Sequence, residues 1–240
     1  MSKLGFFISK KIGRAICDFN MIQDGDRVAV AVSGGKDSLG LLKILEDRRS
    51  IVPIKYKVVA LYLDMGYGSM FSDTLKRYFR KNGYKYHIKK INILNTVGGN
   101  RAKINCFWCS WSRRKHLFEL AHKYGCKKLA LGHHKDDIIH TLLLNMFFQG
   151  DISSMAPKQE MFKGEITIIR PLAYVEEKEL SQFAKELKFP LSSCRCPNSG
   201  KNNRILMKQI VSSVEKVCPH VKANLFRSIY PMEKKCSKTR

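Results

Sequence analysis

The chain has 240 residues, 44% of them hydrophobic, which is enough for one sizeable core with appendages. Lys and Arg number 44 against 20 Asp and Glu, so the formal net charge is +24 at pH 7. This excess favours a polyanionic partner such as nucleic acid, with lysine-driven solubility or an acidic membrane surface as the alternatives.

We recognise no export signal in the sequence, and the cysteine content is also consistent with a location in the cytosol. No run approaches the roughly 20 apolar residues that cross a bilayer, and the first residues lack the apolar stretch and cleavage site of an export signal. We therefore expect a cytoplasmic protein with no membrane contact. Thiols stay reduced in that compartment, so the eight cysteines are expected to serve metal or redox chemistry rather than disulfides.

An amphipathic basic helix is predicted over residues 4–21, within an N-terminal segment of residues 1–24. Apolar side chains recur there at helical spacing among Lys10, Lys11 and Arg14. Packing on the main domain is favoured, and a dedicated RNA arm is the alternative.

Residues 25–190 alternate between strand-like and helix-like segments. The apolar runs are RVAVAV, KVVALYLD, YHIKKINI, KKLALG and ITIIRPL. The helix-length segments begin near Asp37, Ser72, Cys109, Asp136 and Glu176. This alternation predicts an α/β fold with a doubly wound, mostly parallel five-stranded sheet and helices on both faces. Such a sheet binds ligands at the carboxyl ends of its strands.

Residues 191–232 are assigned to a cysteine-bearing C-terminal segment and helix. The turn-rich stretch FPLSSCRCPNSGKNNR leads into a predicted helix over residues 205–217. Residues 233–240 are expected to form a disordered basic tail.

The first strand runs directly into a candidate phosphate-binding loop. Its residues are Ser33, Gly34, Gly35, Lys36, Asp37 and Ser38. The adjacent glycines let the backbone turn tightly around an anion, Lys36 adds a positive charge, and the serines can donate hydrogen bonds. The spacing differs from the GxxxxGKS/T loop, because one glycine alone separates the first glycine from the lysine.

A second polar element follows the fourth strand. Gly132 ends this strand, and Asp136 and Asp137 begin the next helix. Carboxylates at that place either cap the helix or hold Mg2+ beside the phosphates. Asp136 fits either role, whereas the two neighbouring histidines favour a functional role for Asp137.

Four cysteines are candidate metal ligands. Cys106 and Cys109 form a CFWC motif, whose two sulfurs can face one metal or cluster. Cys194 and Cys196 lie far away in the sequence, in SCRCPNSG.

The hexapeptide SGGKDS resembles the PP-loop of the N-type ATP pyrophosphatases. Together with CFWC, LGHHKDD, IIRPLAYVEEKEL and FPLSSCRCPNSGKNNR, it makes the chain similar to the PP-loop tRNA thiolation family, and most similar to its 2-thiocytidine branch. The resemblance covers most residues from about position 27 to 210. It implies that ATP is cleaved between the α and β phosphates, that the substrate is adenylated and that pyrophosphate leaves.

The resemblance also implies the roles of individual residues. Lys36 and Asp137 would be catalytic. The nucleotide would be bound by Ser33, Gly34, Gly35, Lys36, Asp37, Ser38, Leu63, Gly132 and Asp137, with Mg2+ beside the phosphates. Cys106, Cys109 and Cys196 would hold a 4Fe-4S cluster whose open iron carries sulfide, with Cys194 as the alternative third ligand. A structural zinc bound by all four thiolates, or a persulfide-bearing cysteine without a cluster, are the competing interpretations.

The implied reaction is replacement of oxygen by sulfur at C2 of a tRNA pyrimidine, the anticodon-loop cytidine at position 32 in the closest branch. The sulfur donor would be a cysteine desulfurase or free sulfide, and the family also forms homodimers. Trp108, Trp111 and Arg113 are candidate contacts to the RNA loop, with burial in the core as the alternative for the tryptophans.

Competing functions are a 2-thiouridine-forming relative, a PP-loop tRNA ligase that adds an amine, and a zinc-containing RNA-binding module with a relict nucleotide site. The family usually carries an acidic residue where Ile139 and His140 stand, so no role is assigned there. The paired zinc-ribbon cysteines that begin the thiouridine-forming relatives are absent from this sequence, which favours the thiocytidine branch.

Overall fold

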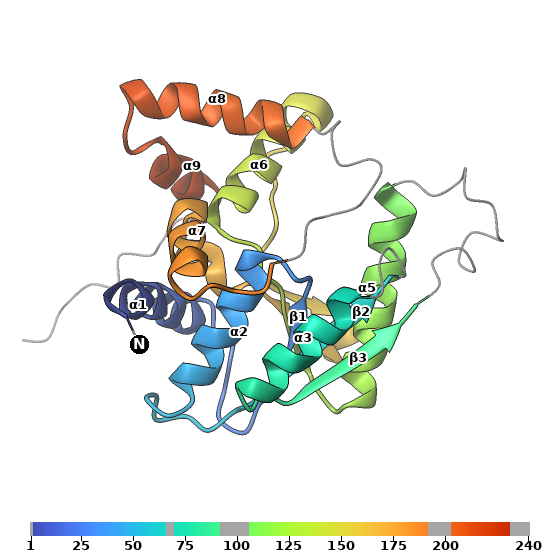
Figure 1. Cartoon of the computed structure of the whole chain (residues 1–240). Coiled ribbons are helices and arrows are strands. Elements are labelled where there is room, and N and C mark those ends of the chain that lie inside the picture. The colour runs from blue at the N-terminus through green and yellow to red at the C-terminus, as the bar shows by residue number, and fades with distance from the viewer. Residues whose placement is uncertain (1, 66–69, 92–105, 192–202, 231–240) are drawn as a thin grey trace, which may run out of the picture. The chain divides into compact units, whose positions relative to one another are not determined.

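Five parallel strands and one antiparallel edge strand form a single sheet in the order β3-β2-β1-β4-β6-β5, of which Figure 1 labels β1, β2 and β3. The computed structural model describes residues 2–65, 70–91, 106–191 and 203–230. The strands are β1 (Arg27–Val32), β2 (Lys57–Asp64), β3 (Tyr86–Lys90), β4 (Lys128–Ala130), β5 (Lys158–Met161) and β6 (Ile166–Ile169). The mostly parallel sheet expected from the sequence is confirmed.

The chain divides into two compact units. The first comprises Met1–His134 and Ala156–Lys201 and holds the whole sheet, and the second comprises Lys135–Met155 and Asn202–Arg240. Helices of the first unit are α1 (Lys3–Asp18), α2 (Lys36–Arg48), α3 (Met70–Lys81), α5 (Cys106–Lys123) and α7 (Glu177–Glu186), with 3₁₀ turns η2 (Phe162–Gly164) and η3 (Pro171–Tyr174). Helices of the second unit are α6 (Lys135–Gln149), α8 (Asn203–Val217) and α9 (Val221–Ile229).

The predicted number of five strands is wrong by one, because β5 was not recognised. Its sequence KQEM contains one apolar residue, and its side chains are exposed or half-buried. It pairs antiparallel with β6 at the edge of the sheet, with Lys158 opposite Ile169. An edge strand that packs little apolar surface leaves no hydrophobic run in the sequence.

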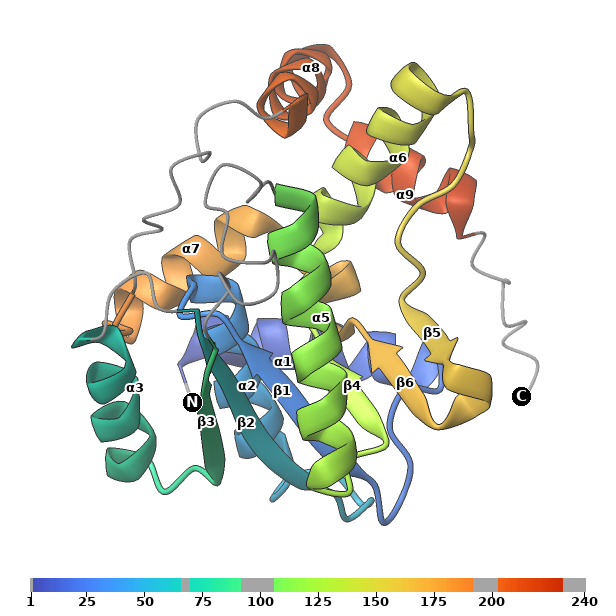
Figure 2. The same ribbon diagram turned by 90° about the vertical axis from the view of Figure 1, so that its right-hand side faces the viewer.

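Both faces of the sheet are buried, as a parallel sheet requires. Val28, Val30 and Val32 of β1 belong to a core shared with α1, α2, α3 and α7, whereas Ala29 belongs to a second core shared with α5. Figure 2 shows α5 lying across one face of the sheet, with α1 and α2 behind it. Alternate side chains of β1 point to opposite faces of the sheet, so one layer of helices packs on each face.

The N-terminal helix α1 is part of the first core. Ile8 and Ile12 are completely buried, and Lys11 pairs with Glu179 of α7 at 2.7 Å. Its basic outer face carries Phe6, whose side chain is 49% exposed. The helix ends at Asp18, shortly before Asn20 adopts a positive φ of 45°.

The second unit is a small helical cluster. Ile139 and Leu143 of α6 pack against Met207 and Val211 of α8. Lys222 of α9 adds an ion pair of 3.1 Å to Asp136 and one of 3.2 Å to Glu215. The sequence predicted α8 but not α9. Among the described residues, no helix combines the length and apolarity needed to cross a membrane.

Phe79 of α3 should be one of the most destabilising sites of truncation. Its side chain is completely buried and its ring lies 5.2 Å from that of Tyr86 on β3. Phe79→Ala is expected to lower the free energy of unfolding by about 3–5 kcal/mol. Urea denaturation measures this loss, and Phe6→Ala on the exposed face of α1 is the control. Equal stability of the two variants would contradict the packing of α3 on the sheet.

Candidate nucleotide and metal site

The loop Ser33–Ser38 connects β1 to α2 and is held by its own serines. The Ser33 amide donates to Oγ of Ser38 at 3.1 Å, and the Gly35 amide donates to Oγ of Ser33 at 3.3 Å. Oγ of Ser38 donates to the Gly35 carbonyl at 3.0 Å. Gly34 has a φ of 85°, a conformation that L side chains rarely adopt. The hydroxyls therefore stabilise the shape of the loop.

The amino end of α2 fits an anion. Gly35 is the N-cap residue and has no side chain to occupy the first-turn amides of the helix. These amides and the helix dipole favour a negatively charged group at this place. The residues present therefore suit the phosphates of ATP.

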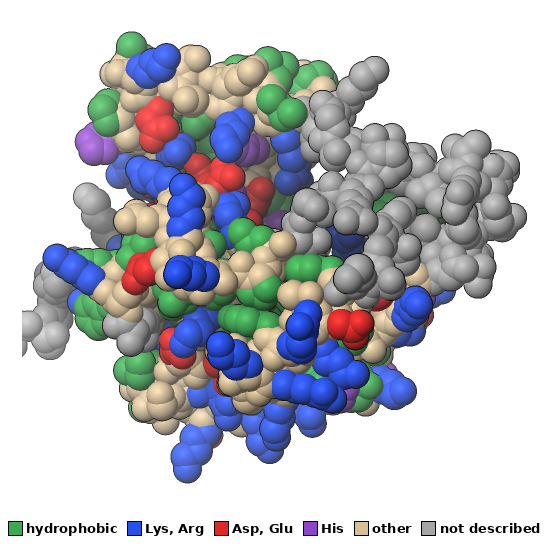
Figure 3. All heavy atoms as spheres, viewed as in Figure 1, with side chains coloured by type: hydrophobic (Ala, Val, Ile, Leu, Met, Phe, Trp, Pro, Cys, Tyr) green, Lys and Arg blue, Asp and Glu red, His purple; other side chains and the backbone are tan. Residues whose placement is uncertain are grey.

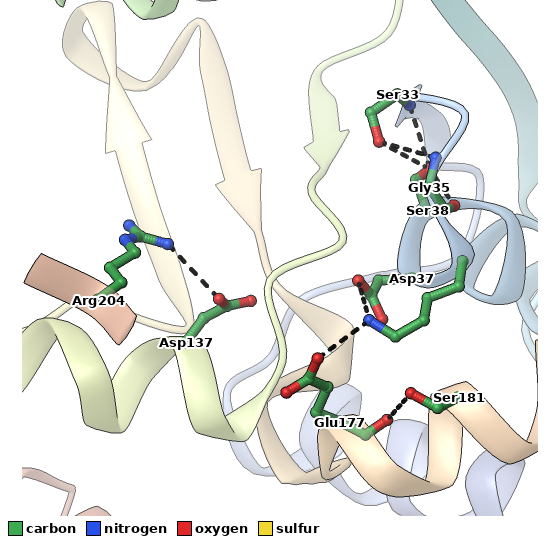
Figure 4. A network of polar contacts seen from close by, with 9 residues as sticks. Ser33, Gly35, Asp37, Ser38, Asp137, Glu177, Ser181 and Arg204 are labelled. Carbon is green, nitrogen blue, oxygen red and sulfur yellow. Dashed lines mark hydrogen bonds and ion pairs between the residues drawn. The ribbon is translucent and has the colours of Figure 1, made fainter. Parts of the chain in front are cut away.

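Lys36 is the cation of this loop, and it is already paired with Asp37 and Glu177, both of which Figure 4 labels. Its Nζ lies 3.1 Å from Oδ2 of Asp37 and 3.4 Å from Oε1 of Glu177, at the start of α7. Burial by itself lowers the pKa of Lys36, but the Asp37 and Glu177 carboxylates outweigh it, and the pKa is raised above its usual value. The ammonium is therefore charged at neutral pH.

Gly132 lies directly against the phosphate loop. A Cβ added to Gly132 would lie 3.0 Å from the Ser38 amide nitrogen and 3.2 Å from the carbonyl carbon of Asp37. The contact arises because β4 is the neighbour of β1, with Val30 opposite Ala130. The chain passes from β1 out to β2 and β3 and then returns to β4, so the loop lies at the point where the strand order reverses.

The end of β2 supplies a further polar group at the carboxyl edge of the sheet. Asp64 is 6% exposed and accepts a hydrogen bond of 2.6 Å from Oγ of Ser72 on α3. The adjacent Leu63, our expected adenine contact, has its side chain buried in the core shared with α5. Neither Asp64 nor Glu177 was among the site residues predicted from the sequence. The runs KVVALYLD and IIRPLAYVEEKEL contain these two residues, but neither run by itself indicated a role for them.

Asp136 and Asp137 occupy the first turn of α6 in the second unit, where both are ion-paired. Arg204 of α8 lies 3.5 Å from Oδ1 of Asp137, and Lys222 of α9 lies 3.1 Å from Oδ1 of Asp136. Figure 4 labels the Asp137 pair. The role of Asp137 toward Mg2+ stays a prediction. Among the described residues, no group of three His, Cys, Asp or Glu side chains could hold a metal ion.

The cysteines are only partly described. Cys106 is the first residue of α5, and Cys109 lies one helical turn later and is half-buried. Cys194 and Cys196 lie outside the described residues. Thiolate sulfur is a ligand both of zinc and of iron-sulfur clusters. The donor chemistry of Cys109 therefore suits an iron or zinc centre.

Comparison with solved structures supports the fold. The U34-tRNA thiolase of Methanococcus maripaludis, solved with its 4Fe-4S cluster, is 24% identical, with a TM-score of 0.75, covering 92% of this chain and 77% of that chain. The NH3-dependent NAD synthetase of Campylobacter jejuni is 15% identical, with a TM-score of 0.53, covering 98% of this chain and 95% of its own. At these identities the likeness is one of architecture.

Comparison by sequence gives the family. The PP-loop domain family matches residues 8–192. A tRNA-cytidine(32) 2-sulfurtransferase of Geobacter sulfurreducens is 45% identical over 226 residues, covering 92% of this chain and 88% of the relative. The protein of the same name from Polynucleobacter asymbioticus is 41% identical over 232 residues, covering 95% and 77%. The chain therefore belongs to the PP-loop domain family and, within it, to the tRNA-cytidine(32) 2-sulfurtransferases.

Proposed function

We propose that this protein is a cytoplasmic ATP-dependent tRNA sulfurtransferase that replaces the C2 oxygen of the anticodon-loop cytidine 32 by sulfur. Relatives named for this reaction align over 92% of the chain. The observation that carries the proposal is the loop Ser33–Ser38 at the reversal of strand order, packed against Gly132. Activation of the base needs a phosphate site, and this loop supplies one.

The first half-reaction would activate the base. The first-turn amides of α2 would bind the phosphates of ATP, and Lys36 would neutralise their charge. The C2 oxygen then attacks the α phosphorus, the bond between the α phosphorus and the bridging oxygen breaks, and pyrophosphate leaves. Asp137 is our candidate ligand for the Mg2+ that accompanies ATP.

The second half-reaction would exchange oxygen for sulfur. Hydrosulfide attacks C2, the bond from C2 to oxygen breaks, AMP leaves, and the proton of hydrosulfide passes to solvent. A 4Fe-4S cluster held by Cys106, Cys109 and either Cys196 or Cys194 would keep one iron open for sulfide. A cysteine desulfurase or free sulfide is the proposed sulfur source.

A basic surface on α3 suits the phosphate backbone of tRNA. Its exposed cations are Lys76, Arg77, Arg80 and Lys81. Figure 3 shows the face of the first unit that carries α3, with Lys and Arg side chains close together and few carboxylates among them. Such a surface binds RNA through release of counterions.

Lys36→Met should abolish the reaction without unfolding the protein. Loss of the phosphate-facing charge is expected to lower the tRNA-dependent release of pyrophosphate by about 100-fold or more. The assay contains unmodified tRNA, ATP and sulfide. Lys43→Met is the matched control, because Lys43 lies on the same helix and pairs with Asp47 at 2.6 Å. Unchanged turnover in Lys36→Met would contradict the role of the loop, and no thiolation by anaerobically purified wild-type protein would contradict the proposed function.

Cys109→Ser should lose the metal centre. Anaerobically purified wild-type protein is expected to contain about four irons and four sulfides per chain, which the variant loses. Iron, sulfide and zinc analysis with an absorption spectrum measures this. Cys17→Ser, at an exposed free cysteine on α1, is the control and should keep the cluster. If the wild-type protein instead contains stoichiometric zinc and no iron, the proposed cluster is wrong and the centre is a structural zinc site.

Replacing Lys76, Arg77, Arg80 and Lys81 together by Gln should weaken tRNA binding and flatten its salt dependence. Each lost phosphate contact lowers the slope of log K against log salt by about 0.7–0.9. Filter binding at several salt concentrations measures the slope. Lys178→Gln on α7, paired with Glu176 at 3.0 Å, is the control. An unchanged slope in the α3 variant would show that tRNA binds elsewhere.

A further inference from the structure

In the first turns of α5, two tryptophan side chains are exposed to solvent, whereas the side chain of a serine is buried. Trp108 is 40% exposed and Trp111 is 45% exposed. Ser112, the next residue, is completely buried, and the Ser112 carbonyl lies 2.8 Å from Nδ1 of His116. Tryptophan gains far more free energy from burial than serine does. Core packing therefore does not account for these tryptophans.

The two indoles and a lysine form one continuous stripe. Trp108, Trp111 and Lys115 are spaced three and four residues apart, so they lie on one face of the helix. The indole rings are T-shaped, with centroids 5.8 Å apart and an interplanar angle of 80°. Nζ of Lys115 lies 5.6 Å from the centroid of Trp111. We call these three residues the indole stripe.

We propose that the indole stripe stacks an unpaired base of the RNA substrate beside Cys109, the proposed metal ligand. The stripe begins one residue from Cys109, and exposed Arg114 lies on the same outer side of α5. This inference rests on the proposed function and identifies residues that position the RNA. Indole rings stack on nucleobases, whereas the flanking cations attract the phosphates.

Charge favours RNA as the occupant. The chain carries a net charge of +24, and the polar residues that flank the tryptophans on α5 include Arg113, Arg114 and Lys115. A base and its phosphate offer a π face and a negative charge together, which matches an indole with a cation above it. Bases inside a duplex are already stacked on both faces, so the stripe should require an unpaired loop base.

The two tryptophans of the stripe are the only tryptophans of the chain, so indole fluorescence reports on the stripe alone. We would titrate the full-length protein with an unmodified anticodon stem-loop RNA, without ATP or sulfide. Stacking is expected to quench the emission as the RNA binds. The same strand annealed to its complement should bind through its phosphates with little quenching. Saturated binding of the stem-loop, measured by anisotropy, with unchanged emission would overturn the proposal.

Trp111→Ala should weaken stem-loop binding about 5- to 150-fold, the range of one lost base–aromatic stack. Trp111→Phe, which keeps a ring, should recover most of the affinity. The loss should persist at high salt, because stacking does not depend on released counterions. Phe6→Ala is the matched control, since Phe6 is 49% exposed beneath Lys10 at 4.8 Å on α1.

The outcomes separate this inference from the proposed function. Wild-type affinity in Trp111→Ala, with thiolation of tRNA by the wild-type protein, would refute the indole stripe and keep the sulfurtransferase. A wild-type protein that binds and quenches with the stem-loop but never thiolates tRNA would refute the sulfurtransferase and keep the stripe. Equal quenching by the stem-loop and the duplex would refute stacking of an unpaired base.

Discussion

The turn from β1 into α2 is the constraint on which the candidate site depends. Gly34 at a positive φ reverses the chain, and the two serines fix the reversal through hydrogen bonds within the loop. The turn must also leave room for the segment that follows β4, whose Gly132 lies against the loop backbone. Any side chain at position 132 would press on the Ser38 amide. The candidate phosphate site therefore depends on two strands, although its residues come from one motif.

Burial on both faces of the sheet keeps this turn in place. The valines of β1 pack under α2 and α7, and the alternate alanine packs under α5. The α7 side of this packing also brings Glu177 to Lys36. The same core that stabilises the strand thus places a carboxylate beside the lysine and keeps its pKa raised. The contacts that stabilise β1 therefore also determine the electrostatic environment of Lys36.

The charge distribution suits a large anionic substrate rather than ATP alone. Exposed cations on α3 can track a phosphate backbone, and the proposed stacking on the indole stripe of α5 would add a contact that does not depend on salt. The combination suits an RNA that is held by its backbone and presents one loop base to the chemistry. Recognition of an unpaired base, as proposed, would use both kinds of surface.

The sequence by itself determined five of the six strands, the phosphate loop, the CFWC motif and the family, because each is carried by local periodicity or by contiguous residues. It did not determine β5, whose polar edge position leaves no apolar run. It did not indicate the pairing of Lys36 with Glu177, which are 141 residues apart, or the approach of Gly132 to Ser38. Nor did it decide whether the tryptophans of α5 were buried. These features arise when segments distant in the chain are brought together, and only the tertiary structure sets those distances.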